Sequence, residues 1–150
     1  MYNSTPAAVI VPDTSVVLKW YLHRQEPQRD KALSLLAAYL EGHLLLVILD
    51  LLVYEMTNVL RYKPDWDTVR VQQAIDSFFA LGLEIMTPSA SSLKRAVEIA
   101  YSYDITVYDA CFIAISEQNK ALFVTADMEL ISKIGEFPFV QSLGLATFVF

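Results

Sequence analysis

Four acidic residues of this sequence lie inside apolar stretches, where a side chain that is normally hydrated is costly to place. They are Asp13, Glu55, Asp109 and Asp127. A carboxylate that leaves water must be hydrogen-bonded, paired with a cation or bound to a metal ion. No Lys or Arg lies within three residues of Glu55, Asp109 or Asp127. If the four carboxylates converge in the folded chain, a divalent cation is the simplest way to neutralise them.

The types of the surrounding residues indicate which cation would bind. A cluster of carboxylates without His or Cys favours Mg²⁺ or Mn²⁺ over zinc, because hard divalent ions prefer oxygen ligands. The two histidines, His23 and His43, are twenty positions apart and follow no metal-ligand spacing. The single cysteine, Cys111, lies in an apolar helical run and is predicted to be a small buried side chain.

Three of the four acids could instead have a purely structural role at the start of a helix. Asp13, or Thr14 beside it, could cap the helix that follows. Asp109 comes three residues after Thr106, which is the spacing of a capping box. Asp127 could be the N-cap of a helix over residues 128–134. Each of these interpretations also permits a site, because helix N-termini stabilise anions.

Glu55 has no such structural explanation. The helical period places it in the middle of a helix, on the same face as Leu51, Leu52 and Val59. It caps nothing there, and its one local polar neighbour at helical spacing is Asn58, which carries no charge. Glu55 is therefore the strongest single indication of a site.

The elements that must position these acids follow from an alternation of short apolar runs and longer helical patterns. Strands are predicted at Ala8–Val11, Leu44–Ile48, Leu83–Met86 and Ala121–Val124, with a fifth from Val140 and Ala146–Phe150. Helices are predicted at Ser15–His23, Pro27–Leu40, Leu51–Arg61, Thr68–Leu81, Ser91–Tyr103, Val107–Asn119 and Met128–Ile134. The pattern predicts an α/β fold with a central parallel sheet of about five strands between helical layers. Length favours one domain over residues 8–150, after a short tail of residues 1–7.

Composition and charge limit the partners that the chain can have. The chain has 150 residues, 55% of them hydrophobic, and a net charge of −6. Its overall charge repels nucleic acid, so such contact needs a local basic strip or a bridging metal ion. Lys19, Arg61 and Lys63 lie near the acids in the sequence and could contact nucleic-acid phosphates, although solvated surface cations without a role are the commoner case. The high apolar content predicts a homodimer.

Targeting features are lacking in the sequence. The N-terminal residues 1–6 have neither the basic segment nor the apolar run of a signal peptide. The longest apolar stretch, Leu44–Leu49, ends at Asp50 and is too short to span a membrane. We therefore expect a cytoplasmic protein without membrane contact.

Four short motifs, each containing one of the acids, resemble those of PIN-domain nucleases, and within that family those of VapC-type toxins. They are Asp13-Thr14-Ser15 after a strand, Glu55 with Asn58-Val59-Leu60-Arg61, Tyr108-Asp109-Ala110 before an apolar helix, and Thr125-Ala126-Asp127 after a strand. The Lys19-Trp20 pair is also typical of the family, and the similarity runs from about Val9 to Phe150.

The resemblance implies an Mg²⁺- or Mn²⁺-dependent endoribonuclease that cleaves single-stranded RNA, forms a homodimer and is inhibited by an antitoxin protein. Asp13, Glu55, Asp109 and Asp127 would form its catalytic, metal-binding site. Supporting residues would be Ser15 and Thr125, which orient the acids by hydrogen bonds, and Asn58 of the second motif. Asp50 departs from the family pattern, which more often has Ser or Pro there, but it can still cap its helix. Residues 137–144 match no family pattern.

Two other functions are compatible with a parallel α/β sheet that carries acids. A receiver-type signalling domain would need an acidic pair after the first strand and a Lys after the last, and neither is present. A binding module that keeps the fold without catalysis is the other alternative, and the complete acidic set argues against it.

Overall fold

The computed structural model describes residues 7–23 and 25–148 and contains one parallel sheet. Its strands are β1 (Ala8–Pro12), β2 (Leu44–Leu49), β3 (Glu84–Met86), β4 (Leu122–Thr125) and β5 (Val140–Ser142). They lie in the order β3-β2-β1-β4-β5, and every neighbouring pair is parallel. The predicted α/β fold with a five-stranded parallel sheet is confirmed. This order differs from the 2-1-3-4-5 order of receiver domains, which removes that alternative.

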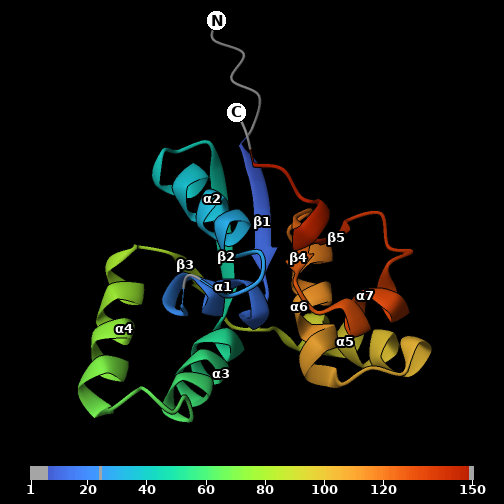
Figure 1. Cartoon of the computed structure of the whole chain (residues 1–150). Coiled ribbons are helices and arrows are strands. Elements are labelled where there is room, and N and C mark those ends of the chain that lie inside the picture. Colours follow the sequence, from blue (N-terminus) through green and yellow to red (C-terminus); the bar gives the residue numbers. More distant parts are fainter. Residues whose placement is uncertain (1–6, 24, 149–150) are drawn as a thin grey trace, which may run out of the picture.

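Helices cover the sheet and extend beyond its carboxyl edge. They are α1 (Thr14–Tyr21), α2 (Arg29–Leu40), α3 (Asp50–Arg61), α4 (Thr68–Ala80), α5 (Ala90–Tyr103), α6 (Val107–Gln118) and α7 (Met128–Ile134), followed by a 3-10 helix at Leu143–Leu145. In Figure 1, α3 and α4 lie on one side of the molecule, and α5, α6 and α7 gather on the other. No helix of the described residues is both long and apolar enough to cross a membrane.

The core forms where apolar strands meet the apolar faces of helices. In β1 and β2 most side chains are buried, as expected for parallel strands covered on both faces. In α6 the whole run from Ala110 to Ser116 is buried, so this helix lies inside the domain. Cys111 belongs to that run, and its prediction as a buried side chain is confirmed.

The end of the chain differs from the prediction. The fifth strand is Val140–Ser142, paired with β4, and residues 146–148 form no strand. The 3-10 helix turns the chain away from the sheet, and the Ala146 N–H donates to the carbonyls of Ser142 and Leu143, at 3.2 Å each. The apolar side chain of Ala146 is buried against the core without strand pairing. Residues 149–150 of the predicted strand, and residues 1–6 of the predicted tail, lie outside the described residues.

The register of the central strands places the acids. Ile10 pairs with Leu122 and Pro12 with Val124, so β1 and β4 end side by side. The Asp13 N–H continues this pairing by donating to the Val124 carbonyl at 3.1 Å. The turns that follow both strands therefore lie at the same carboxyl edge, where parallel α/β sheets bind their ligands.

Candidate active site

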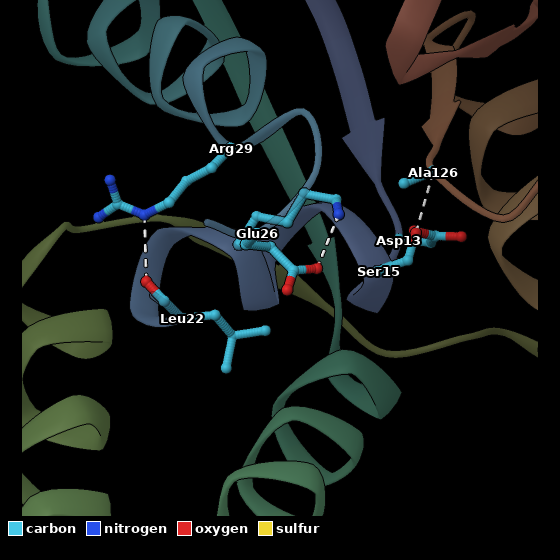
Figure 2. Close-up of polar contacts among 7 residues, drawn as sticks. Asp13, Ser15, Leu22, Glu26, Arg29 and Ala126 are labelled. Carbon is cyan, nitrogen blue, oxygen red and sulfur yellow. Dashed lines mark hydrogen bonds and ion pairs between the residues drawn. The ribbon is translucent and has the colours of Figure 1, made fainter. Parts of the chain in front are cut away.

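Asp13 is a buried carboxylate held by two hydroxyl groups. Only 7% of the residue is exposed. Ser15 Oγ donates to Asp13 Oδ1, and Thr125 Oγ1 donates to Asp13 Oδ2. Ser15 Oγ also accepts from the Ala126 N–H at 2.9 Å, which ties the turn after β1 to the turn after β4 (Figure 2). Although Asp13 occupies the N-cap position of α1, its side chain makes no capping hydrogen bond. The Val16 N–H is close enough to lower the pKa of Asp13, but it lacks the geometry of a capping hydrogen bond, so the capping interpretation of this side chain is wrong.

Glu55 lies on α3, half-buried, and contacts the start of α1. Its Oε1 accepts from Thr14 Oγ1 at 2.8 Å, across 41 residues of sequence. Glu55 and Asp13 thus lie on the same side of the sheet edge. Asn58 is exposed in a groove between α3 and α4, and the described residues show no hydrogen bond between it and Glu55. Asp50 is the first residue of α3 and does not cap it, because the N-cap is Leu49.

Asp109 and Asp127 lie at helix starts but use their carboxylates differently. Thr106 Oγ1 caps α6 by accepting from the Asp109 N–H at 3.1 Å, so the Asp109 carboxylate is not the cap. The Asp127 carboxylate itself caps α7, because Oδ1 accepts from the Leu130 N–H at 3.0 Å. The capping interpretation is confirmed for Asp127. Both acids line a cavity of about 220 Å³.

The pKa values of Asp13, Glu55 and Asp109 are all raised, and burial is the main cause in each case. Burial raises the pKa of Asp13 from 3.8 to about 6, against the hydrogen bonds from Ser15 and Thr125, and the Asp109 charge adds to the rise. Burial and, to a smaller extent, Asp109 also raise the pKa of Glu55, which the Thr14 hydrogen bond opposes.

Asp109 is central in this group of acids. Burial raises its pKa, a hydrogen bond with Thr106 opposes the rise, and the Asp127 charge adds to it. Asp109 therefore interacts with each of the other three carboxylates. Within the described part of the chain, none of the four forms a salt bridge. Lys133 lines the same cavity as Asp109 and Asp127, but its Nζ donates to the Asp104 carbonyl at 2.9 Å. Among the described residues, the site therefore concentrates negative charge without an ion pair.

The donor set fits a hard divalent cation. Every candidate ligand is a carboxylate oxygen, and these oxygens carry unbalanced charge. In the described residues, no three His, Cys, Asp or Glu side chains are arranged to hold a metal ion together. Mg²⁺ commonly binds through one or two carboxylates and keeps several waters, so an interacting pair such as Asp13 and Asp109 is sufficient. Direct coordination by all four acids stays a prediction.

The nearby cations mostly have structural partners. Lys19 is buried and its Nζ donates to Glu26 at 2.9 Å, so it is neither a solvated surface cation nor free to contact a ligand. Arg29 Nε donates to the Leu22 carbonyl at 3.1 Å (Figure 2). Arg61 is exposed and lies over the Tyr62 ring at 5.1 Å. Arg61 and Lys63 are the other two predicted phosphate contacts. Arg61 is the more accessible of them, because Lys63 is half-buried.

Residues 10–136 match the sequence profile of the PIN domain. The chain belongs to the PIN-domain family. This match covers most of the chain and includes all four acids. It confirms the family that the motifs indicate. No curated protein sequence matches the chain.

Solved structures similar to this PIN domain include a toxin–antitoxin complex, a VapBC complex and an RNA-cleaving toxin. VapBC2 from Rickettsia felis, bound to a promoter DNA fragment, matches with a TM-score of 0.66 and 16% identity, over 89% of this chain and 98% of that one. A toxin–antitoxin complex from Klebsiella pneumoniae gives 0.64 and 16%, over 91% and 98%. VapC20 from Mycobacterium tuberculosis, a sarcin–ricin loop cleaving toxin, gives 0.61 and 13%, over 83% and 96%. At these identities the likeness shows a shared fold.

Proposed function

We propose that this PIN domain is an Mg²⁺- or Mn²⁺-dependent endoribonuclease of the cytoplasm that cleaves single-stranded RNA. The observation that carries the proposal is the buried Asp13 carboxylate, which two hydroxyls hold under the influence of the Asp109 charge, with no salt bridge to it among the described residues. A folded protein gains no stability from such an arrangement unless a ligand balances the charge. The PIN-domain match supports nuclease chemistry at these acids.

The residues of the site would have different roles in the proposed reaction. A bound divalent cation would supply an activated water and stabilise the leaving oxygen. Asp13 and Glu55 would hold it, with Asp109 contributing directly or through water. Ser15 and Thr125 fix both oxygens of Asp13, so the carboxylate keeps one orientation. Asp127 lies at the edge of the site, where its carboxylate already accepts from the Leu130 N–H.

We further propose that the protein is the homodimeric toxin of a toxin–antitoxin pair. The likeness to VapBC2 and to the Klebsiella toxin–antitoxin complex supports an antitoxin partner, and the likeness to VapC20 supports an RNA substrate. An antitoxin segment that offers Arg to the carboxylates would inhibit the site. Leu93, Val97 and Tyr101 are exposed along one face of α5, which supports a dimer. We expect the dimer interface to bury about 1,200–2,000 Å² in total, which is typical of stable protein–protein interfaces.

Cleavage of a labelled single-stranded RNA tests the proposal. We expect products with Mg²⁺ or Mn²⁺, no products with EDTA, and recovery when metal is added back. Asp13→Asn, purified in the same way, controls for contaminating nucleases and should cleave at least about 10²-fold more slowly. Cleavage that persists in EDTA would contradict the metal mechanism, and equal cleavage by Asp13→Asn would contradict the site.

A further inference from the structure

Thr14 makes a contact that its position in the sequence does not suggest. It is the first residue of α1, where a hydroxyl commonly bonds to its own helix. Its Oγ1 instead donates to Glu55 Oε1 at 2.8 Å. Among the described residues this is the one side-chain hydrogen bond between α1 and α3. Thr14 therefore connects the turn that carries Asp13 to the helix that carries Glu55.

This hydrogen bond fixes the orientation of the Glu55 carboxylate. A glutamate has three rotatable side-chain bonds, so a half-buried one without a fixed partner can adopt several rotamers. The bond to Thr14 engages Oε1, and no other donor among the described residues contacts this carboxylate. Oε2 keeps its lone pairs for another ligand. Asp13 is oriented in the same way, by the hydroxyls of Ser15 and Thr125.

A purely structural role for the Thr14 hydroxyl is the competing explanation. The helices α1 and α3 already pack against each other, and both contribute fully buried apolar side chains. The Asp13 carbonyl accepts the first N–H groups of α1, from Val16 at 3.2 Å and Val17 at 3.4 Å. The start of α1 is therefore supported without the Thr14 side chain.

We propose that Thr14 is a positioning residue that holds Glu55 ready for the divalent cation. This inference rests on the proposed function, because Glu55 needs a fixed orientation only if it has a ligand to bind. Hydrogen-bond partners that orient metal-binding side chains typically contribute about 10- to 100-fold to metal affinity or activity. Thr14 would therefore affect metal affinity without contacting the metal ion.

Mn²⁺ binding to the protein alone, without RNA, tests the inference. Electron paramagnetic resonance of free Mn²⁺ gives the dissociation constant. Thr14→Val should raise it by about 10-fold or more, and Thr14→Ser, which keeps the hydroxyl, should restore it. Thr57→Val is the matched control, because the Thr57 hydroxyl lies on the same helix as Glu55 and donates to the Val53 carbonyl at 2.8 Å. It should bind Mn²⁺ like the wild type.

The outcomes separate this inference from the proposed function. Equal Mn²⁺ affinity of Thr14→Val and wild type would overturn the role of Thr14 and leave the metal site intact. An equal loss in Thr57→Val would also overturn it, because any lost hydroxyl would then suffice. Absence of Mn²⁺ binding by the wild type would overturn the proposed function and this inference with it. If Thr14→Val does not fold, Thr14→Ala, which suits a helix, replaces it in the same comparison.

Discussion

Asp13 and Asp127 follow neighbouring parallel strands, yet their carboxylates are used in opposite ways. Asp127 is exposed, and its carboxylate accepts from a backbone N–H of the helix that it begins. Asp13 also precedes a helix but does not cap it with its side chain, and it is buried with hydroxyl donors on both oxygens. Helix formation therefore explains Asp127 without any ligand. Asp13 has no such explanation, so it is the acid that most directly indicates a site.

Activity should separate these two acids by the largest margin. Asp13→Asn removes the charge held between Ser15 and Thr125, and we expect RNA cleavage to fall by about 10²-fold or more, as when one preorganised electrostatic group is lost. RNA cleavage should fall less in Asp127→Asn, because Asn caps a helix about as well as Asp and residue 127 lies at the edge of the site. Initial rates at saturating Mg²⁺ measure both. Equal losses would remove the distinction between them.

The pH dependence of stability should also distinguish Asp13. Its pKa rises from 3.8 to about 6 on folding, so the metal-free folded state binds this proton more tightly than the unfolded state. The resulting stability is present below about pH 4 and is lost as the pH rises through about 6. The rise corresponds to about 3 kcal/mol at most.

Asp13→Asn has no charge to form at this position and should not show that loss. In EDTA, the free energy of unfolding of Asp13→Asn minus that of wild type should increase between about pH 4 and pH 7, so the variant becomes relatively more stable. Urea denaturation at several pH values gives the difference. A difference that stays constant over this range would show that the Asp13 carboxylate is not destabilised by burial.

A smaller effect should separate the two acids at helix starts. In EDTA, Asp127→Ala should lower stability by about 1 kcal/mol, because α7 loses its side-chain cap. Asp109→Asn keeps the Thr106 cap of α6 and relieves repulsion with the other acids, so it should stabilise the metal-free protein slightly. Because Asp109 is only half-buried, we expect less than about 1 kcal/mol.

Thermal melts of wild type and both variants, in EDTA and in excess Mg²⁺, measure these changes. Wild type should gain about 2.7 kcal/mol at a hundredfold excess of Mg²⁺ over its dissociation constant. The stability that Mg²⁺ adds should be smaller in Asp109→Asn than in wild type. In Asp127→Ala it should be larger than in Asp109→Asn. An Mg²⁺ gain in Asp109→Asn equal to that of wild type would exclude Asp109 from the metal site.

The sheet could be predicted from the sequence because its strands are short, continuous apolar runs between helical patterns. The same signal failed at residues 146–148, where Ala146 is buried and Phe148 packs against the core outside any strand. Whether these residues pair as a strand depends on the register of β5 against β4, and that pairing ends at Ser142. A local sequence pattern does not contain that register. Apolar character reports burial and does not by itself report strand pairing.

The acids could be predicted because each one interrupts an apolar stretch. The resemblance also implied that Ser15 and Thr125 orient the acids, and both donate to Asp13, but the partners of Glu55 and Lys19 could not be predicted. The Thr106–Asp109 spacing indicates a capping box, which has two reciprocal hydrogen bonds. The structure contains one of them, from the Asp109 N–H to Thr106 Oγ1. The bond from Thr14 to Glu55 joins residues 41 positions apart, so no local pattern reveals it. Lys19 looked like a surface cation because its pairing with Glu26 depends on the fold of the segment between them.

Diffraction from crystals soaked in Mn²⁺ tests the central claim most directly, because anomalous scattering locates the ion without an assay. The account predicts a peak beside the Asp13 carboxylate, coordinated by Asp13 and by Glu55 or Asp109, directly or through one water. The same soak of Asp13→Asn crystals should give a much weaker peak there. A wild-type map with no peak beside Asp13 at saturating Mn²⁺, or with its main peak away from these acids, would contradict the account.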